Sequence, residues 1–216
     1  EWPVPLMGRI GEAFLHLPPE VLQTSMREHQ KFFSVRNSKT GRIEGFVTVA
    51  NTVTADHGET ILKGNQKVLS ARLSDAAFFW DNDLRVARAG MGEWLEGLKA
   101  VTFHNKLGSQ ADRISRIAAL AREIAPLVGA DADLAEQAAR LAKADLRSAM
   151  VGEFPELQGV MGRYYALEAL KANPPRPSSR GLGETTGGPG SGPGRVEAVA
   201  DAARGHYSPL GPSDAV

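Results

Sequence analysis

The stretch AKADLRSAMVGEFPELQGVMGRYYA, residues 142–166, decides how the second half of the chain folds. Most of its residues favour helix. Phe154-Pro155 interrupts the stretch, because proline lacks a backbone N–H and is tolerated only in the first turn of a helix. Gly159 and Gly162 follow three residues apart, and glycine lets another element approach closely. The stretch therefore predicts a helix, a corner at Pro155 and a second helix with a small-residue face.

Apolar residues recur at helical spacing on both sides of this stretch, which predicts a largely helical region. One helix begins at Gly64, with apolar positions that continue to Trp80, and a second runs from about Leu84 to Thr102. The remaining helices are expected at 109–128, at 132–150, after Pro155 and at 195–207.

Capping residues define some of these helix ends. Ser109 is followed three residues later by Asp112, which is the spacing of a capping box. Asp131 is the expected N-cap of the helix at 132–150, and Gly129 is expected to end the helix before it.

Residues 1–60 carry a β-rich pattern instead. Phe33 and Val35, a turn at 37–41 and the run 43–53 predict a hairpin with a glycine-closed loop. Pro18-Pro19 precede a short segment for which helix and strand both remain open. The predicted fold class is therefore α+β, with an N-terminal hairpin-containing piece followed by a mostly helical bundle.

Composition also divides the chain. Residues 173–194 are rich in proline, glycine, serine and threonine, which predicts a flexible insertion because few apolar groups offset the entropy of ordering it. We expect residues 1–62 to be the end of a β-rich domain and 63–172 a helical domain. Residues 195–216 are expected to hold the last helix of that domain and a truncated C-terminal end.

The overall composition excludes several classes of protein. The 216 residues contain 25 Lys and Arg against 25 Asp and Glu, so the net charge indicates no partner. There is no cysteine, which fits a reducing compartment, and no apolar run approaches the ~20 residues of a membrane span. We expect a cytoplasmic fragment of a longer protein, without a membrane partner.

No motif for metal or nucleotide chemistry is present. The five histidines include no pair at i, i+4, and no His-Asp dipeptide occurs. Asp145 and Glu156 would form a general acid–base pair only if both faced a cleft, whereas Glu156 suits the first turn of a helix. We therefore predict no catalytic residue, no metal ligand and no cofactor bound by this part of the chain.

Basic residues concentrate on two of the predicted helices. Arg140, Lys143 and Arg147 would lie at i, i+3 and i, i+4 positions of one helix. Such a stripe is either a solvated helix face or a surface for contacts with phosphate. Tyr164 and Tyr165 also have two interpretations: they stack on bases, or one ring lies in the core and the other on the surface. The candidate RNA-binding residues are Arg113, Arg116, Arg140, Lys143 and Arg147.

Several long segments resemble one family. KGNQKVLSARLSDAAFFWDND (63–83), VTFHNKLGS (101–109) and AARLAKADLRSAMVGEFPELQGVMGRYYA (138–166) are similar to the bacterial glycyl-tRNA synthetase beta subunit. REHQKFFSVRN, FVTVANT and HYSP match the same family in the same order. The likeness covers roughly 12–171 and 195–214, and the long connection at 173–194 departs from it.

The resemblance implies one half of a ligase that joins glycine to tRNA(Gly) with ATP. The alpha subunit, a partner, would carry the aminoacylation site, and the beta subunit would act chiefly through tRNA binding and assembly. The helical domain would be HD-like, and the missing His-Asp dyad would mean that it lacks metal chemistry. Two alternatives remain: a divergent HD-like metal-dependent phosphohydrolase using Asp145, Glu153 and His104, or a purely structural interaction module.

Overall fold

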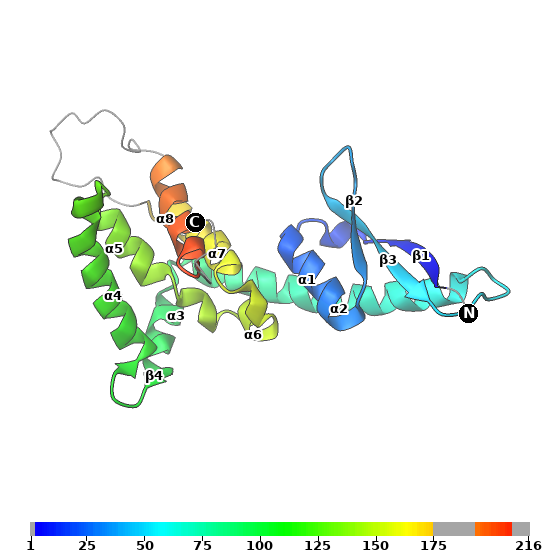
Figure 1. Cartoon of the computed structure of the whole chain (residues 1–216), viewed down its shortest axis with the longest axis horizontal. Helices are drawn as coiled ribbons and strands as arrows, with labels where there is room; N and C mark the ends of the chain where they lie inside the picture. The colour runs from blue at the N-terminus through cyan, green and yellow to red at the C-terminus, as the bar shows by residue number, and fades with distance from the viewer. Residues whose placement is uncertain (1–2, 175–192, 209–216) are drawn as a thin grey trace. The chain divides into compact units, whose positions relative to one another are not determined.

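The computed structural model describes residues 3–174 and 193–208, which form two compact units, residues 1–81 and 82–216 (Figure 1). The expected insertion at 173–194 and the expected C-terminal end lie largely outside the described residues. Within the described ranges, no helix is long and apolar enough to cross a membrane. The α+β class is confirmed, because a three-stranded antiparallel sheet precedes a mostly helical region.

The first unit contains a three-stranded sheet in the order β1-β3-β2. The predicted hairpin is confirmed, since β2 (Phe33–Arg36) pairs with β3 (Ile43–Ala50). The chain between them turns at Asn37, whose carbonyl accepts from Gly41 N at 2.8 Å. Strand β1 (Val4–Arg9) pairs with the other side of β3. The segment after Pro18 is a helix, α1 (Pro19–Gln30), which begins with Pro19 in the first turn.

Helix α1 covers one face of this sheet, which we call the inner face. Val21, Leu22 and Met26 of α1 are buried, and the Phe32 ring stacks on Phe46 with 4.8 Å between centroids. Helix α1 also follows a short 3-10 turn, η1 (Glu12–Phe14). The inner face therefore carries the core of the first unit.

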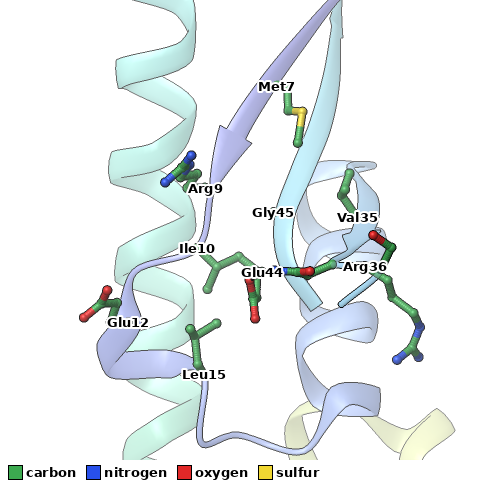
Figure 2. Close-up of a pocket in the computed structure, with 11 residues that line it drawn as sticks. Met7, Arg9, Ile10, Glu12, Leu15, Val35, Arg36, Glu44 and Gly45 are labelled. Carbon is green, nitrogen blue, oxygen red and sulfur yellow. Dashed lines mark hydrogen bonds between the residues drawn. The ribbon is translucent and has the colours of Figure 1, made fainter. Parts of the chain in front are cut away.

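The opposite face of the sheet, which we call the outer face, is open in the first unit. A pocket of about 480 Å³ lies against it and is lined in part by Met7, Arg9 and Val35 (Figure 2).

The second unit is built mainly from helices packed in pairs. Helix α4 packs against α5, α5 against α8, and α8 against α7. Its core contains Met161, Tyr165, Val199 and Ala200, which are almost fully buried. The elements are α3 (Gly92–Gly97), η2 (Leu98–Ala100), β4 (Thr102–His104), β5 (Gly108–Ser109), α4 (Gln110–Ile124), η3 (Ala125–Val128), α5 (Ala132–Leu141), η4 (Ala144–Arg147), α6 (Ala149–Glu153), η5 (Pro155–Leu157), α7 (Val160–Ala172) and α8 (Pro193–Gly205).

The expected break between Trp80 and Leu84 is wrong. A single helix of 30 residues, α2 (Glu59–Arg88), runs through this region. The polar run Asp81-Asn82-Asp83 is typical of a boundary, but Asp83 is buried at 3% exposure and finds its partners elsewhere in the fold. The helix predicted to reach Thr102 stops earlier, because Met91 adopts a left-handed conformation with φ +59°. A short hairpin, β4–β5, connects the two regions predicted as helices at about 84–102 and 109–128.

The predicted continuous helix at 132–150 is also wrong. Helix α5 ends at Leu141, and the chain passes through η4 before α6 starts. Ser148 breaks the run because it adopts an extended conformation (ψ 149°) and caps α6 by accepting from Val151 N at 3.1 Å. The corner at Pro155 is confirmed, with Pro155 in the first turn of η5.

The predicted capping box at the start of α4 is confirmed. The Ser109 hydroxyl accepts from Asp112 N at 3.2 Å, and the Asp112 carboxylate accepts from Ser109 N at 2.8 Å. Asp131 caps α5 as predicted, and Gly129 ends η3 in a left-handed conformation.

Replacing Ser109 with alanine is expected to destabilise the second unit by about 1 kcal/mol, because the Asp112 N–H loses its acceptor at the helix start. Ser115→Ala, on the exposed surface of the same helix, is the matched control and should change the free energy of unfolding by less than about 0.5 kcal/mol. Hydrogen exchange of α4 measures both. Equal protection in the two variants would show that the cap contributes nothing.

Candidate nucleic-acid interface

The candidate RNA-binding residues lie on separate elements of the second unit. Arg113 and Arg116 are on α4, Arg140 is in the last turn of α5, and Arg147 is the last residue of η4. Lys143 lies in the turn between α5 and η4. The expected stripe of Arg140, Lys143 and Arg147 on one helix is therefore wrong, because α5 ends before Lys143.

Two of these cations each lie over an aromatic ring. The Arg113 guanidinium carbon is 4.3 Å from the centroid of Phe103, and Lys143 Nζ is 3.6 Å from the centroid of Tyr207. Such contacts stabilise a cation through the negative face of the ring. Phe103 comes from β4 and Tyr207 from just after α8, so tertiary packing brings segments about a hundred residues apart to one surface.

Lys143 also interacts electrostatically with Arg113. Burial lowers the pKa of the Lys143 ammonium, and the nearby Arg113 guanidinium lowers it further, while Asp145 opposes the shift. Arg116 lies one turn along from Arg113 and donates to the Leu107 carbonyl at 3.0 Å. We call Arg113, Arg116 and Lys143 the basic cluster. Among the described residues, none of its members forms an ion pair with a carboxylate.

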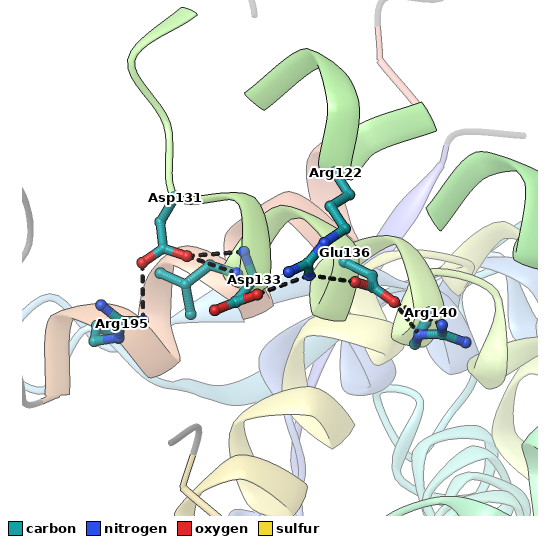
Figure 3. Close-up of polar contacts among 7 residues, drawn as sticks. Arg122, Asp131, Asp133, Glu136, Arg140 and Arg195 are labelled. Carbon is teal, nitrogen blue, oxygen red and sulfur yellow. Dashed lines mark hydrogen bonds and ion pairs between the residues drawn. The ribbon is translucent and has the colours of Figure 1, made fainter. Parts of the chain in front are cut away.

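The other two candidates are differently placed. Arg140 Nη2 lies 2.6 Å from Glu136 Oε1, and Glu136 also binds Arg122 at 2.6 Å (Figure 3). Asp133 binds Arg122 from the same helix as Glu136, so acidic groups surround these arginines. Arg147 is exposed, and its guanidinium lies against Gly97, where an added Cβ would be 2.8 Å from Arg147 Nε.

Exposed apolar side chains share α4 with Arg113 and Arg116. Ile117, Leu120 and Ile124 are all exposed, and their spacing places them along one side of the helix. Leu127 and Val128 of η3 are more exposed still. The surface of α4 is therefore mixed, basic at its start and apolar further along.

Tyr165 is a core residue and not a stacking platform. Its ring is fully buried and packs edge-on against Trp94 with 5.1 Å between centroids. Its hydroxyl donates to Asp83 Oδ2 at 2.7 Å. The interpretation as a core ring thus applies to Tyr165. Sequence reasoning misses Phe103 and Tyr207, the rings that do support cations, because each ring lies on a different element from the cation that it contacts.

Asp83 organises a buried polar cluster around this ring. Its carboxylate accepts from Ala149 N at 2.9 Å and Met150 N at 3.0 Å, the first N–H groups of α6. Burial raises the pKa of Asp83, while these donors and the Tyr165 hydroxyl act in the opposite direction. The cluster fastens the end of α2 to the start of α6 and to α7.

Asp145 is likewise structural. It is fully buried, and its Oδ2 accepts from Gly159 N at 2.6 Å. Burial raises the pKa of the Asp145 carboxyl, and the Gly159 N–H opposes that shift. Glu156 is exposed in the first turn of η5. A buried carboxylate held by a backbone N–H cannot share a cleft with Glu156, so the two do not form a general acid–base pair.

The alternative metal site does not assemble. In the described parts of the chain, no group of three His, Cys, Asp or Glu side chains is placed to hold a metal ion. His104 is exposed on β4, whereas Asp145 is buried beneath α7. Asp145, Glu153 and His104 therefore do not make the ligand set that the phosphohydrolase hypothesis requires.

Comparison with known proteins adds independent evidence. Residues 1–174 match the family described as glycyl-tRNA synthetase beta subunit. The chain is 74% identical over its whole length to the glycine–tRNA ligase beta subunit of Paracoccus denitrificans, and 63% identical to that of Dinoroseobacter shibae. The corresponding protein of Rhodospirillum centenum is 44% identical over 220 aligned residues. The chain spans 27–28% of the length of these relatives.

The family match extends to residue 174 and includes β1–β3, the Asp83 cluster and all of the basic cluster, whereas Tyr207 lies outside it. It agrees with the segments of sequence that resemble the same family. The chain belongs to the glycyl-tRNA synthetase beta subunit family.

Proposed function

We propose that this chain is a region of the beta subunit of a glycine–tRNA ligase and supports the ATP-dependent attachment of glycine to tRNA(Gly). The single observation that carries the proposal is the family match over residues 1–174. In this proposal the alpha subunit carries the aminoacylation site, ATP is used by the whole cytoplasmic enzyme, and this region binds no cofactor of its own.

The contribution of this region is contact with the tRNA backbone through the basic cluster. Phosphate contacts supply most of the affinity of proteins for nucleic acids, and they need cations that are not already paired with carboxylates. Arg113, Arg116 and Lys143 meet this condition better than Arg140, which acidic groups surround. The rings of Phe103 and Tyr207 hold two of these cations in place.

We further infer that the second unit is an HD-like scaffold without metal chemistry. Lys143 and Asp145 occupy the stretch where a His-Asp dyad would be sought, and a cation there opposes binding of a divalent ion. The buried Asp145 supports a structural role for that stretch, since its carboxylate accepts from Gly159 N.

Neutralising the basic cluster in the assembled enzyme is expected to weaken tRNA(Gly) binding. Arg113→Gln and Lys143→Met each remove a charge and keep most of the side-chain stem. Each should raise the Kd about fivefold, or ~1 kcal/mol, and reduce the slope of log Kd against log salt by about one. Binding titrations at several salt concentrations measure both quantities, and the Michaelis constant for tRNA in aminoacylation should rise in parallel.

Arg85→Gln is the matched control, since Arg85 is an exposed arginine of α2 in the same unit. Its Kd and salt slope should equal those of the unaltered enzyme. If Arg113→Gln and Lys143→Met fold normally, and neither the Kd at low salt nor the salt slope changes, the basic cluster does not contact tRNA.

A second candidate function is a structural module that docks onto another protein surface. The exposed Ile117, Leu120 and Ile124 of α4 favour it, because exposed apolar patches mark interaction sites. Unchanged tRNA binding in the variants above would favour this role over RNA contact.

A further inference from the structure

The outer face of the β1-β3-β2 sheet is apolar across all its strands. The register places Met7, Val47 and Phe33 side by side, with Pro5 opposite Val49 in the next row. An antiparallel sheet with one face in water normally alternates apolar and polar residues, so that only the inner face is apolar. In this sheet Leu6 and Phe46 fill the inner face while the intervening residues are apolar as well.

These outer-face side chains are open to solvent in the first unit. Met7 is 62% exposed, Phe33 65% and Val49 50%. The pocket of about 480 Å³ adjoins them, and its lining combines Met7 and Val35 with the charged Arg9, Glu12, Arg36 and Glu44 (Figure 2). A flat apolar face with a pocket at one end is a surface that another segment would cover.

We propose that in the full-length subunit this outer face is covered by an apolar segment of the same polypeptide that lies outside residues 1–216. The relatives are more than three times as long as this chain, which spans 28% of their length, so most of the polypeptide is available to supply the cover.

The size of the face favours a tethered segment over a separate protein. Pro5, Met7, Phe33, Val35, Val47 and Val49 make up its apolar surface, whereas a stable interface between separate proteins needs about 800 Å² and roughly 20–30 residues on each side. A segment of the same chain needs less area, because its tether supplies an effective concentration that can reach about millimolar.

The charge of the face argues against RNA as the occupant. Two cations adjoin this face, Arg9 and Arg36, and both line the pocket at one end together with the acidic Glu12 and Glu44. Phosphate contacts need several cations along the bound backbone. This inference is independent of the basic cluster, which belongs to the second unit.

Cysteine accessibility in the full-length beta subunit tests the proposal. Met7→Cys, Phe33→Cys and Val49→Cys are made one at a time in a subunit whose other cysteines are replaced, and residues 1–216 contain none. Gln23→Cys, on the exposed side of α1 in the same unit, is the matched control. In the free beta subunit, labelling at positions 7, 33 and 49 should be at least tenfold slower than at position 23.

Two further arms separate the possible occupants. Labelling is repeated after addition of the alpha subunit and after addition of tRNA(Gly). Protection already present in the free beta subunit supports the proposal. Equal labelling at all four positions, or protection that appears only with the alpha subunit or only with tRNA, would overturn it.

A photoreactive amino acid at position 33 provides a second measurement that does not depend on labelling rates. Cross-links should join Phe33 to peptides of the beta subunit outside residues 1–216. Cross-links found only to the alpha subunit, only to tRNA, or to none of them would reject the proposed cover.

Discussion

Asp83→Ala is expected to destabilise the second unit by about 3–5 kcal/mol, because it breaks a buried polar cluster. The carboxylate is 3% exposed and accepts from Ala149 N, Met150 N and the Tyr165 hydroxyl. Removing it takes the acceptor away from the Ala149 and Met150 N–H groups, and each such loss costs about 1–3 kcal/mol. Hydrogen exchange across α6 and α7 in the full-length subunit measures the loss.

Two companion variants make this result interpretable. Asp81→Ala removes an exposed carboxylate from the same helix and should change stability by less than about 0.5 kcal/mol. Tyr165→Phe removes one donor and leaves Asp83 with its backbone partners, so its cost should be about 1.5–3 kcal/mol. If Asp83→Ala lowered the free energy of unfolding no more than Asp81→Ala, the Asp83 carboxylate would not be the group that joins α2 to α6.

Gly159→Ala should destabilise the second unit by about 2–5 kcal/mol. Gly159 has φ +76° and ψ −45°, a positive-φ conformation outside the αL region that costs other residues at least about 1 kcal/mol. An added Cβ would also lie 2.5 Å from Tyr207 Cδ2 and 3.2 Å from the Arg204 carbonyl, and overpacking of this kind costs about 1–3 kcal/mol. Thermal unfolding and hydrogen exchange of α7 and α8 measure the total loss of stability.

Gly129→Ala separates the two contributions. Gly129 also has a positive φ, +72°, but with ψ 18° it is in the αL region, and an added Cβ there meets nothing within 4 Å. It should therefore show the backbone cost alone, about 1–2 kcal/mol. Equal losses at the two positions would show that Tyr207 moves aside freely.

This pair also bears on the proposed tRNA contact. Displacing Tyr207 removes the ring that lies 3.6 Å from Lys143 Nζ, so Gly159→Ala should weaken tRNA(Gly) binding, whereas Gly129→Ala should not. Unchanged tRNA affinity in a folded Gly159→Ala subunit would separate the ring from the role of Lys143.

Local features of the chain can be predicted from sequence because their partners are close in sequence. The capping box of Ser109 and Asp112 joins residues three apart, and the hairpin turn at 37–41 closes between adjacent strands. The corner at Pro155 follows from the missing backbone N–H of proline. The family can also be identified from the sequence, since long segments match in order.

The errors share one physical cause, which is that distant partners override local pattern. Asp83 resembles a helix end because a charged residue is costly to bury, yet donors 66 and 67 positions away satisfy it inside α2. The helix predicted over 132–150 breaks because Ser148 caps α6, whose first N–H groups make that same contact. This break separates the arginines and lysine expected in one stripe.

The sequence by itself determined the fold class, the hairpin, the caps and the family, because each rests on neighbouring residues or on long continuous matches. Only the tertiary structure decided which cations gather at one surface, since Phe103 and Tyr207, which support Arg113 and Lys143, lie far apart in the sequence. Local propensity is set within a few residues, whereas the position of a charge on the surface depends on how buried groups such as Asp83 and Asp145 join distant helices.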